Sequence, residues 1–235
     1  EDFLALTAGA TYHGDRWSWT GRAEWRDADT TKRYGVTVAT MRQIGEGKAL
    51  GGALNWFRAK QAGGATTTTA AAEISWAHRP ASSVWSILNK TEFRHDAVKN
   101  AVAGLPGPVG GAPLLVNGDV KSNRVINSLS VNYTPIDEDG DRKSGTFIER
   151  GEYGFFWGTR YSTDRFGADD VKGWSNVVGA DLKFDLSDIV DVGVSGTARI
   201  GTSAKNIAYS GGPTVTISPM KNANITLGYN FLGFE

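Results

Sequence analysis

Hydrophobic and polar residues alternate strictly along the stretch Trp17–Asp27. Trp17 and Trp25 fall on one side of an extended strand, whereas Arg22 and Glu24 fall on the other, because successive side chains of a strand point to opposite faces. A soluble protein could bury the tryptophan side in a core. A membrane barrel would instead turn that side toward lipid.

The same two-sided pattern recurs along the whole chain. Each repeat is about ten residues long, which is the length that a tilted strand needs to cross a bilayer, whereas strands of soluble sheets are nearer five or six. The pattern predicts an all-β fold of about twelve visible strands, an antiparallel transmembrane β-barrel, with a soluble all-β binding domain as the alternative. The repeats lie at residues 4–12, 17–27, 34–40, 50–56, 69–76, 85–94, 125–133, 153–162, 174–185, 190–200, 209–217 and 225–231.

Glycine- and proline-containing connections separate the strands, and their lengths suggest an alternation. Those after the first, third, fifth, ninth and eleventh strands are short, whereas those after the second, fourth, sixth and eighth are mostly longer. Residues 95–123 lack a period and are predicted to form a long outer loop; the acidic stretch Asp137–Asp141 is an exception to the alternation. Short periplasmic turns and long outer loops are typical of outer-membrane barrels.

Aromatic residues fall near the two ends of the predicted strands. Tryptophan and tyrosine prefer the two membrane–water interfaces, so the sequence predicts two aromatic belts on the apolar side of the sheet. The candidates are Tyr12, Trp17, Trp25, Tyr34, Trp56, Trp76, Trp85, Tyr133, Tyr161, Trp174 and Phe231.

Composition narrows the classes of function. Lysine plus arginine and aspartate plus glutamate both total 25, so a nucleic-acid partner is not expected. The chain has no cysteine and only three histidines, far apart, so neither disulfides nor a metal site is predicted. No apolar run is long enough for a membrane-spanning helix.

Three segments resemble a known group of proteins. The ending ITLGYNFLGFE, the early stretch RWSWTGRAEWRDADTTKRYG and the central WAHRPASSVW resemble the C-terminal barrels of large proteobacterial outer-membrane surface proteins. The resemblance implies a Gram-negative outer-membrane location. In that group a GYNF-x-GF segment precedes an acidic loop and one last strand, so we expect residues 1–235 to be a single barrel domain of a longer chain.

The polar side of the predicted strands carries charged residues that would line a lumen. They could form an ion-selecting constriction, or they could pair with one another across neighbouring strands. Mixed signs within single strands favour pairing. The candidates are Arg22, Glu24, Arg26, Glu73, Lys90, Glu92, Arg94, Arg160, Asp181, Lys183, Asp185 and Arg199.

No catalytic residue, cofactor or metal site is predicted. The chain lacks a Gly-x-Ser-x-Gly motif, and His13, His78 and His95 lie beside predicted turns or loops. The acidic run beginning at Asp137 lacks the glutamate that a calcium loop carries at its twelfth position, where Ile148 stands.

These patterns predict an outer-membrane barrel that acts as a passive channel or conduit for small solutes or for a partner's segment. The alternative is a membrane anchor for a larger surface or assembly protein, without transport. The expected partners are the lipid bilayer and other protein chains at the barrel seam or in the lumen. Barrels of single bacterial chains have an even strand count with both ends in the periplasm, so we expect at least fourteen strands in the complete protein.

Overall fold

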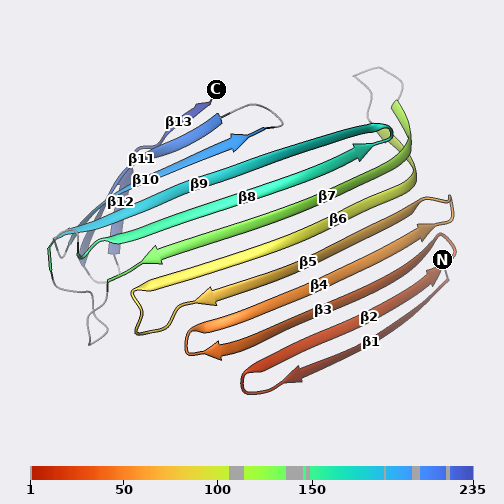
Figure 1. Ribbon diagram of the computed structural model, residues 1–235, viewed down its shortest axis with the longest axis horizontal. Coiled ribbons are helices and arrows are strands. Elements are labelled where there is room, and N and C mark those ends of the chain that lie inside the picture. The colour runs from red at the N-terminus through yellow and green to blue at the C-terminus, as the bar shows by residue number, and fades with distance from the viewer. Residues whose placement is uncertain are drawn as a thin grey trace.

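The fold is one antiparallel sheet in which each strand lies beside its neighbour in sequence (Figure 1). The computed structural model describes residues 2–105, 114–135, 145–146, 149–187, 189–202, 207–220 and 223–234. The strands are β1 (Phe3–His13), β2 (Trp17–Ala28), β3 (Thr31–Gly45), β4 (Lys48–Gln61), β5 (Thr66–His78), β6 (Trp85–Leu105), β7 (Leu114–Tyr133), β8 (Glu152–Phe166), β9 (Asp169–Ser187), β10 (Val190–Gly201), β11 (Ile207–Met220), β12 (Ala223–Gly228) and β13 (Phe231–Phe234). The all-β prediction is confirmed.

β12 and β13 occupy successive stretches of the same edge of β11. Thr214 lies opposite Gly228 and Gly211 lies opposite Phe231, so the register is unchanged across the break. The break falls at Pro213, which has no N–H to donate to its neighbour, although the Tyr229 N–H donates to the Pro213 carbonyl at 3.1 Å. The sheet is therefore twelve strands wide, as the twelve repeats predict.

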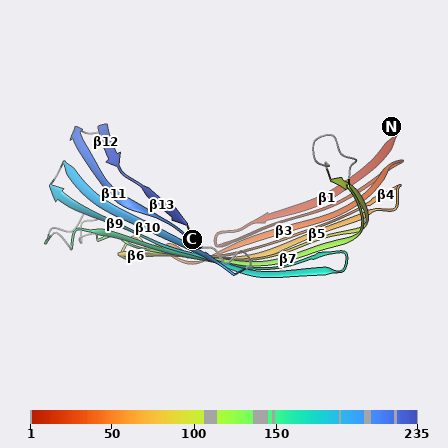
Figure 2. The ribbon, with the colours of Figure 1, turned by 90° about the horizontal axis from the view of Figure 1, so that it is seen from above.

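The sheet is curved and open (Figure 2). β1 pairs only with β2, and β12 and β13 pair only with β11, so no hydrogen bonds join the two edges within the described residues. The described strands therefore form an open sheet and not a closed barrel, and both the barrel and the further strands stay predictions. The part of the chain that the structure describes contains no helix with the length and apolarity needed to cross a membrane.

The prediction of a loop over residues 95–123 is wrong for most of that range. β6 continues to Leu105 and β7 begins at Leu114, and the two strands pair with each other beyond the ends of β5 and β8. A register shift between Val98 and Ala101 and a φ of 53° at Asn100 interrupt the pleat there. Because of this irregularity, hydrophobic and polar residues do not alternate regularly in this part of the sequence.

The predicted alternation of short and long connections is also wrong. β2 and β3 are joined by residues 29–30 and β8 and β9 by residues 167–168, which are turns as short as those at the other end. Charged residues that are typical of loops belong to these strands and pair across them. Lys32 lies 3.0 Å from Asp27, and Arg165 lies 2.7 Å from Asp170. The acidic stretch Asp137–Asp141 lies outside the described residues.

The register gives the sheet two chemically distinct faces. We call them the apolar face, which carries Leu6, Trp25 and Tyr34 at register partners across β1–β3, and the polar face, which carries Thr7 and Glu24 at the next position. We call the end with the connections after β1, β3, β5, β7, β9 and β11 the odd-turn end, at the left of Figure 1, and the opposite one the even-turn end.

Candidate functional site

All the charged lumen candidates lie on the polar face. For example, Glu73, Glu92 and Arg160 belong to one row across β5 to β8, in which Ile126 of β7 lies between Glu92 and Arg160. Following the register across the sheet gives the same face for Arg22, Glu24, Arg26, Glu73, Lys90, Glu92, Arg94, Arg160, Asp181, Lys183, Asp185 and Arg199.

A four-residue ion cluster occupies the middle of the polar face. Glu73 and Glu92 lie directly opposite each other, and the Lys90 Nζ lies 2.7 Å from the Glu73 carboxylate and 3.6 Å from that of Glu92. Arg94 also donates to Glu92. Lys90 and Arg94 thus compensate the charge of Glu92 from two sides. This compensation matters because the Glu92 side chain is only 13% exposed. Ion pairing therefore accounts for these candidates: Lys90 and Glu73 pair across strands, whereas Lys90 and Arg94 pair with Glu92 along β6.

A second cluster joins β2, β3 and β4. The Glu24 carboxylate lies 3.3 Å from Arg22 and 3.1 Å from Arg33. The Arg33 guanidinium lies 5.0 Å from the centre of the Phe57 ring, a cation–π contact. Phe57 covers Gly35, where an added Cβ would lie 2.6 Å from the ring. Glycine at this position lets the aromatic ring lie flat on the sheet.

Arginines gather on the polar face toward the even-turn end. Arg94 lies directly opposite Arg124. The Arg124 Nε donates to the Ser122 hydroxyl at 3.1 Å, and that hydroxyl donates to Asp164 at 2.5 Å. Arg160 lies one row closer to the odd-turn end on β8. Arg94 and Arg124 are thus each held by a neighbouring side chain, Glu92 and Ser122 respectively.

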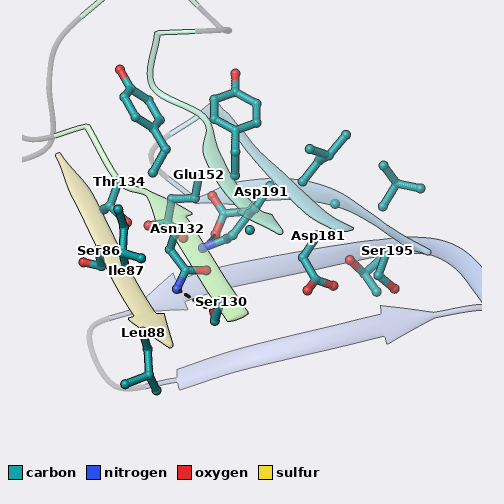
Figure 3. Close-up of a pocket in the computed structure, with 18 of the residues that line it drawn as sticks. Ser86, Ile87, Leu88, Ser130, Asn132, Thr134, Glu152, Asp181, Asp191 and Ser195 are labelled. Atoms are coloured by element: carbon teal, nitrogen blue, oxygen red, sulfur yellow. Dashed lines mark hydrogen bonds and ion pairs between the residues drawn. The ribbon is translucent and has the colours of Figure 1, made fainter. Parts of the chain in front are cut away.

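A hollow of about 800 Å³ opens on the polar face at the odd-turn end and spans β5 to β11 (Figure 3). Asp181 and Ser195 are register partners in its floor. The Lys183 Nζ lies 3.0 Å from Asp191, and the Asn132 amide donates to Ser130 at 3.4 Å. Carboxylate, hydroxyl and amide groups together make a surface that water and small polar or cationic solutes can wet and bind.

Several polar-face residues were absent from the sequence-based candidates. Arg33 and Arg124 lie at the beginning of the predicted strands around Tyr34 and Val125, and extending the alternation by one residue would have found them. Phe57 and Phe156 were not expected on this face. The signal that could have found them is a glycine opposite, Gly35 for Phe57 and Gly179 for Phe156.

The apolar face carries all the aromatic candidates, and most of its side chains are exposed. Trp17, for example, is 50% exposed and Trp174 48%. Ring contacts run along the odd-turn end from Trp85 through Tyr133 and Tyr153, with centroids 5.0 and 5.7 Å apart. At the even-turn end Tyr161 and Trp174 are 5.1 Å apart. The candidates on this face are Tyr12, Trp17, Trp25, Tyr34, Trp56, Trp76, Trp85, Tyr133, Tyr161, Trp174 and Phe231.

A few polar side chains interrupt the apolar face and bind one another. The Asn127 amide donates to the Thr91 hydroxyl at 2.7 Å, and His95 lies 2.7 Å from the Asn123 side-chain oxygen. His95 is therefore inside a strand rather than at the start of a loop. Mutual hydrogen bonding lowers the cost of placing these groups away from water.

Within the described residues, no group of three or more histidine, aspartate or glutamate side chains is arranged to hold a metal ion. No protein-family model matches the chain, and no curated protein matches its sequence.

Proposed function

We propose that this chain forms the wall of a transmembrane β-barrel in the outer membrane of a Gram-negative bacterium and that small polar solutes, or a partner's segment, pass along its polar face. The observation that carries the proposal is the apolar face. Its side chains are exposed from β1 to β13, in a sheet that has no second layer among the described residues. Soluble monomers rarely expose contiguous apolar surface of this extent.

The arrangement on the apolar face supports lipid as its solvent. Aromatic rings occur toward both ends of the strands, at Trp85 and Tyr133 on one side and at Tyr161 and Trp174 on the other. Two such belts match the two interfaces of a bilayer. Strands of 11 to 15 residues, such as β1 and β3, are long enough to span the hydrocarbon when tilted.

In a lipid bilayer, the backbone N–H and C=O groups at both edges of the sheet need hydrogen-bond partners. Each unsatisfied backbone group costs several kcal/mol in hydrocarbon, and one edge of β1 has no partner strand among the described residues. In the membrane, β1 therefore pairs either with the β12–β13 edge or with strands that lie between these edges. The strands between them come from this chain's own protein or from another chain.

The second candidate function is an anchor without transport. Its supporting observation is the ion pairing on the polar face, where Lys90 links Glu73 with Glu92. A paired network of this kind stiffens a wall and needs no permeant ion. Phe57 and Phe156 add apolar bulk to the same face, which would narrow a lumen.

Cysteine accessibility tests the direction of the two faces. Ala23 lies on the apolar face and Glu24 on the polar face of β2. In membranes, Glu24→Cys is expected to react with a water-soluble thiol reagent, and Ala23→Cys is expected to be protected. Reaction of Ala23→Cys alone would mean that the barrel is inside out. Protection of Ala23→Cys in buffer, without any membrane association, would favour a soluble all-β binding domain, because such a domain buries its apolar side in a core.

Single-channel recording in planar bilayers separates the channel from the anchor. Discrete conductance steps from the inserted protein are expected for a channel. Stable insertion, shown by protease protection of the strands, combined with no conductance would support the anchor instead.

A further inference from the structure

We propose that the even-turn end of the apolar face binds the phosphate groups of anionic membrane lipids. This inference rests on the proposed membrane insertion and extends it to the lipid that surrounds the barrel. Basic side chains that have no role in the proposed function lie on the apolar face, in the rows beyond the Tyr161–Trp174 contact.

Basic residues accumulate in these rows from β3 to β9. They occupy apolar-face positions by register, and all of them are exposed. Within β2 to β9 three carboxylates share these rows. Asp27 and Asp170 each have an ion-pair partner, and Asp119 accepts a hydrogen bond from the Asn100 N–H at 3.1 Å. We call the cations the basic rim: Lys32, Arg58, Lys60, Lys99, Lys121, Arg165 and Lys172.

Like charges face each other directly within the basic rim. Lys32 lies opposite Lys60, and Lys121 lies opposite Arg165. Such cross-strand pairs destabilise a sheet, so an anion between them would relieve a repulsion that is built into the register. Lys32 and Arg165 are each compensated by one carboxylate, whereas Lys60 and Lys121 form no ion pair among the described residues.

A hollow of about 250 Å³ lies within the basic rim. Lys121, Arg165 and Lys172 line it together with the side chains of Asn123 and Thr163. Three cations with an amide and a hydroxyl can donate several hydrogen bonds to phosphate oxygens. Asp164 and Asp170 also line the hollow, and Asp170 is engaged by Arg165, so the hollow retains an excess of positive charge.

The position of the basic rim selects lipid phosphate over a dissolved anion. The rim follows the aromatic contact at Tyr161 and Trp174 along the same strands, and headgroups lie just beyond such aromatics in a bilayer. Long lysine and arginine side chains reach from the hydrocarbon boundary to that level. Polybasic segments near a membrane surface attract anionic lipids. The basic rim is therefore at the depth of the lipid phosphate groups.

Quenching of the protein's tryptophan fluorescence by brominated lipids tests the inference. The protein is inserted into phosphatidylcholine vesicles that contain either brominated phosphatidylglycerol or brominated phosphatidylcholine at equal mole fraction. We expect an apparent affinity for phosphatidylglycerol about fivefold above that for phosphatidylcholine, and we expect 0.5 M salt to reduce this preference. Added inorganic phosphate should leave it unchanged.

The variant Lys60→Gln/Lys121→Gln/Lys172→Gln is expected to lose the preference. The matched control is Arg42→Gln/Lys48→Gln, which removes two cations from the same face at the odd-turn end and should keep it. The variant Lys60→Arg/Lys121→Arg/Lys172→Arg keeps the charge and should also keep the lipid preference. Comparing it with the glutamine variant separates loss of charge from loss of fold.

Two negative results have different meanings. Equal quenching by both lipids in the native protein would overturn the basic rim as a lipid site and leave the membrane barrel standing. An absence of quenching by either lipid would show that the sheet does not enter the bilayer and would overturn the proposed function itself. Competition by inorganic phosphate at equal potency would assign the rim to dissolved anions.

Discussion

Glu73 and Glu92 lie directly opposite each other on β5 and β6, and the Lys90 ammonium lies within ion-pair distance of both carboxylates. Two like charges at register partners destabilise a sheet unless a cation compensates them. Lys90 is therefore the residue that makes this arrangement tolerable on the polar face, together with Arg94 beside Glu92.

Lys90→Gln is expected to lower the free energy of unfolding by about 0.5–1 kcal/mol, because the three side chains remain partly hydrated. Adding Glu73→Gln to this variant removes the repulsion and should restore most of the loss. Urea unfolding from lipid vesicles measures both. A double variant that is less stable than Lys90→Gln would contradict the role of the carboxylate pair.

Val194 and Thr197 test the two faces near the middle of β10. Val194 lies on the apolar face and is 45% exposed, whereas Thr197 lies on the polar face. Val194→Arg should destabilise the inserted protein by about 2–4 kcal/mol, the cost of arginine at a bilayer midplane. Thr197→Arg should cost far less, because its side chain meets water. Equal losses in unfolding from lipid would contradict the assignment of faces.

Gly35 is expected to tolerate no side chain. A Cβ there would lie 2.6 Å from the Phe57 ring and 2.8 Å from the Glu24 Cγ, so Gly35→Ala should destabilise by about 1–3 kcal/mol through overpacking. Gly196→Ala is the control, since nothing lies within 4 Å of a Cβ added at that position. Combining Gly35→Ala with Phe57→Ala should remove most of the additional cost, and thermal unfolding can compare all three variants with the native protein.

If the sheet encloses an open channel, that channel should show weak ion selectivity. Cations and carboxylates alternate on the polar face, as at Arg22, Glu24 and Arg26 on β2 and at Lys183 and Asp191 on β9 and β10, so no ring of one sign dominates the field. A reversal potential close to zero in a salt gradient is expected. A potential near the limit for a pure cation or pure anion channel would contradict it.

The Arg165–Asp170 pair should make the β8–β9 hairpin sensitive to acid. The hydrogen-bonded Arg165 guanidinium lowers the pKa of Asp170 from its ordinary value of 3.8. Because the folded pKa lies below the unfolded one, the stabilisation is present above the unfolded pKa and is lost as the pH falls through the folded value. The effect should be small, since both groups are exposed.

The melting temperatures of the native protein and of Asp170→Asn provide the measurement for this pair. Their difference should be constant above about pH 5 and should shrink as the pH falls below about 4. A difference that grows on acidification would mean that Asp170 gains its proton more readily in the folded state.

The sequence alone determined the class of fold and the chemistry of each face. A two-residue period leaves little freedom, because shifting a strand by one residue would turn every side chain to the other face. For this reason the twelve repeats, the aromatic positions and the charged residues from Arg22 to Arg199 could all be assigned to one face or the other before the strands were paired.

Only the tertiary structure decided where strands end and what they place together. Hairpin ends are polar, so Asp27 and Lys32 resembled a loop until their pairing across β2 and β3 was known. The opposition of Lys121 and Arg165 depends on the register between β7 and β8, which no local pattern contains. The open edges of β1 and β12–β13 were likewise decided in three dimensions, because a strand's own sequence specifies its faces, whereas its hydrogen-bonding neighbour depends on the whole sheet.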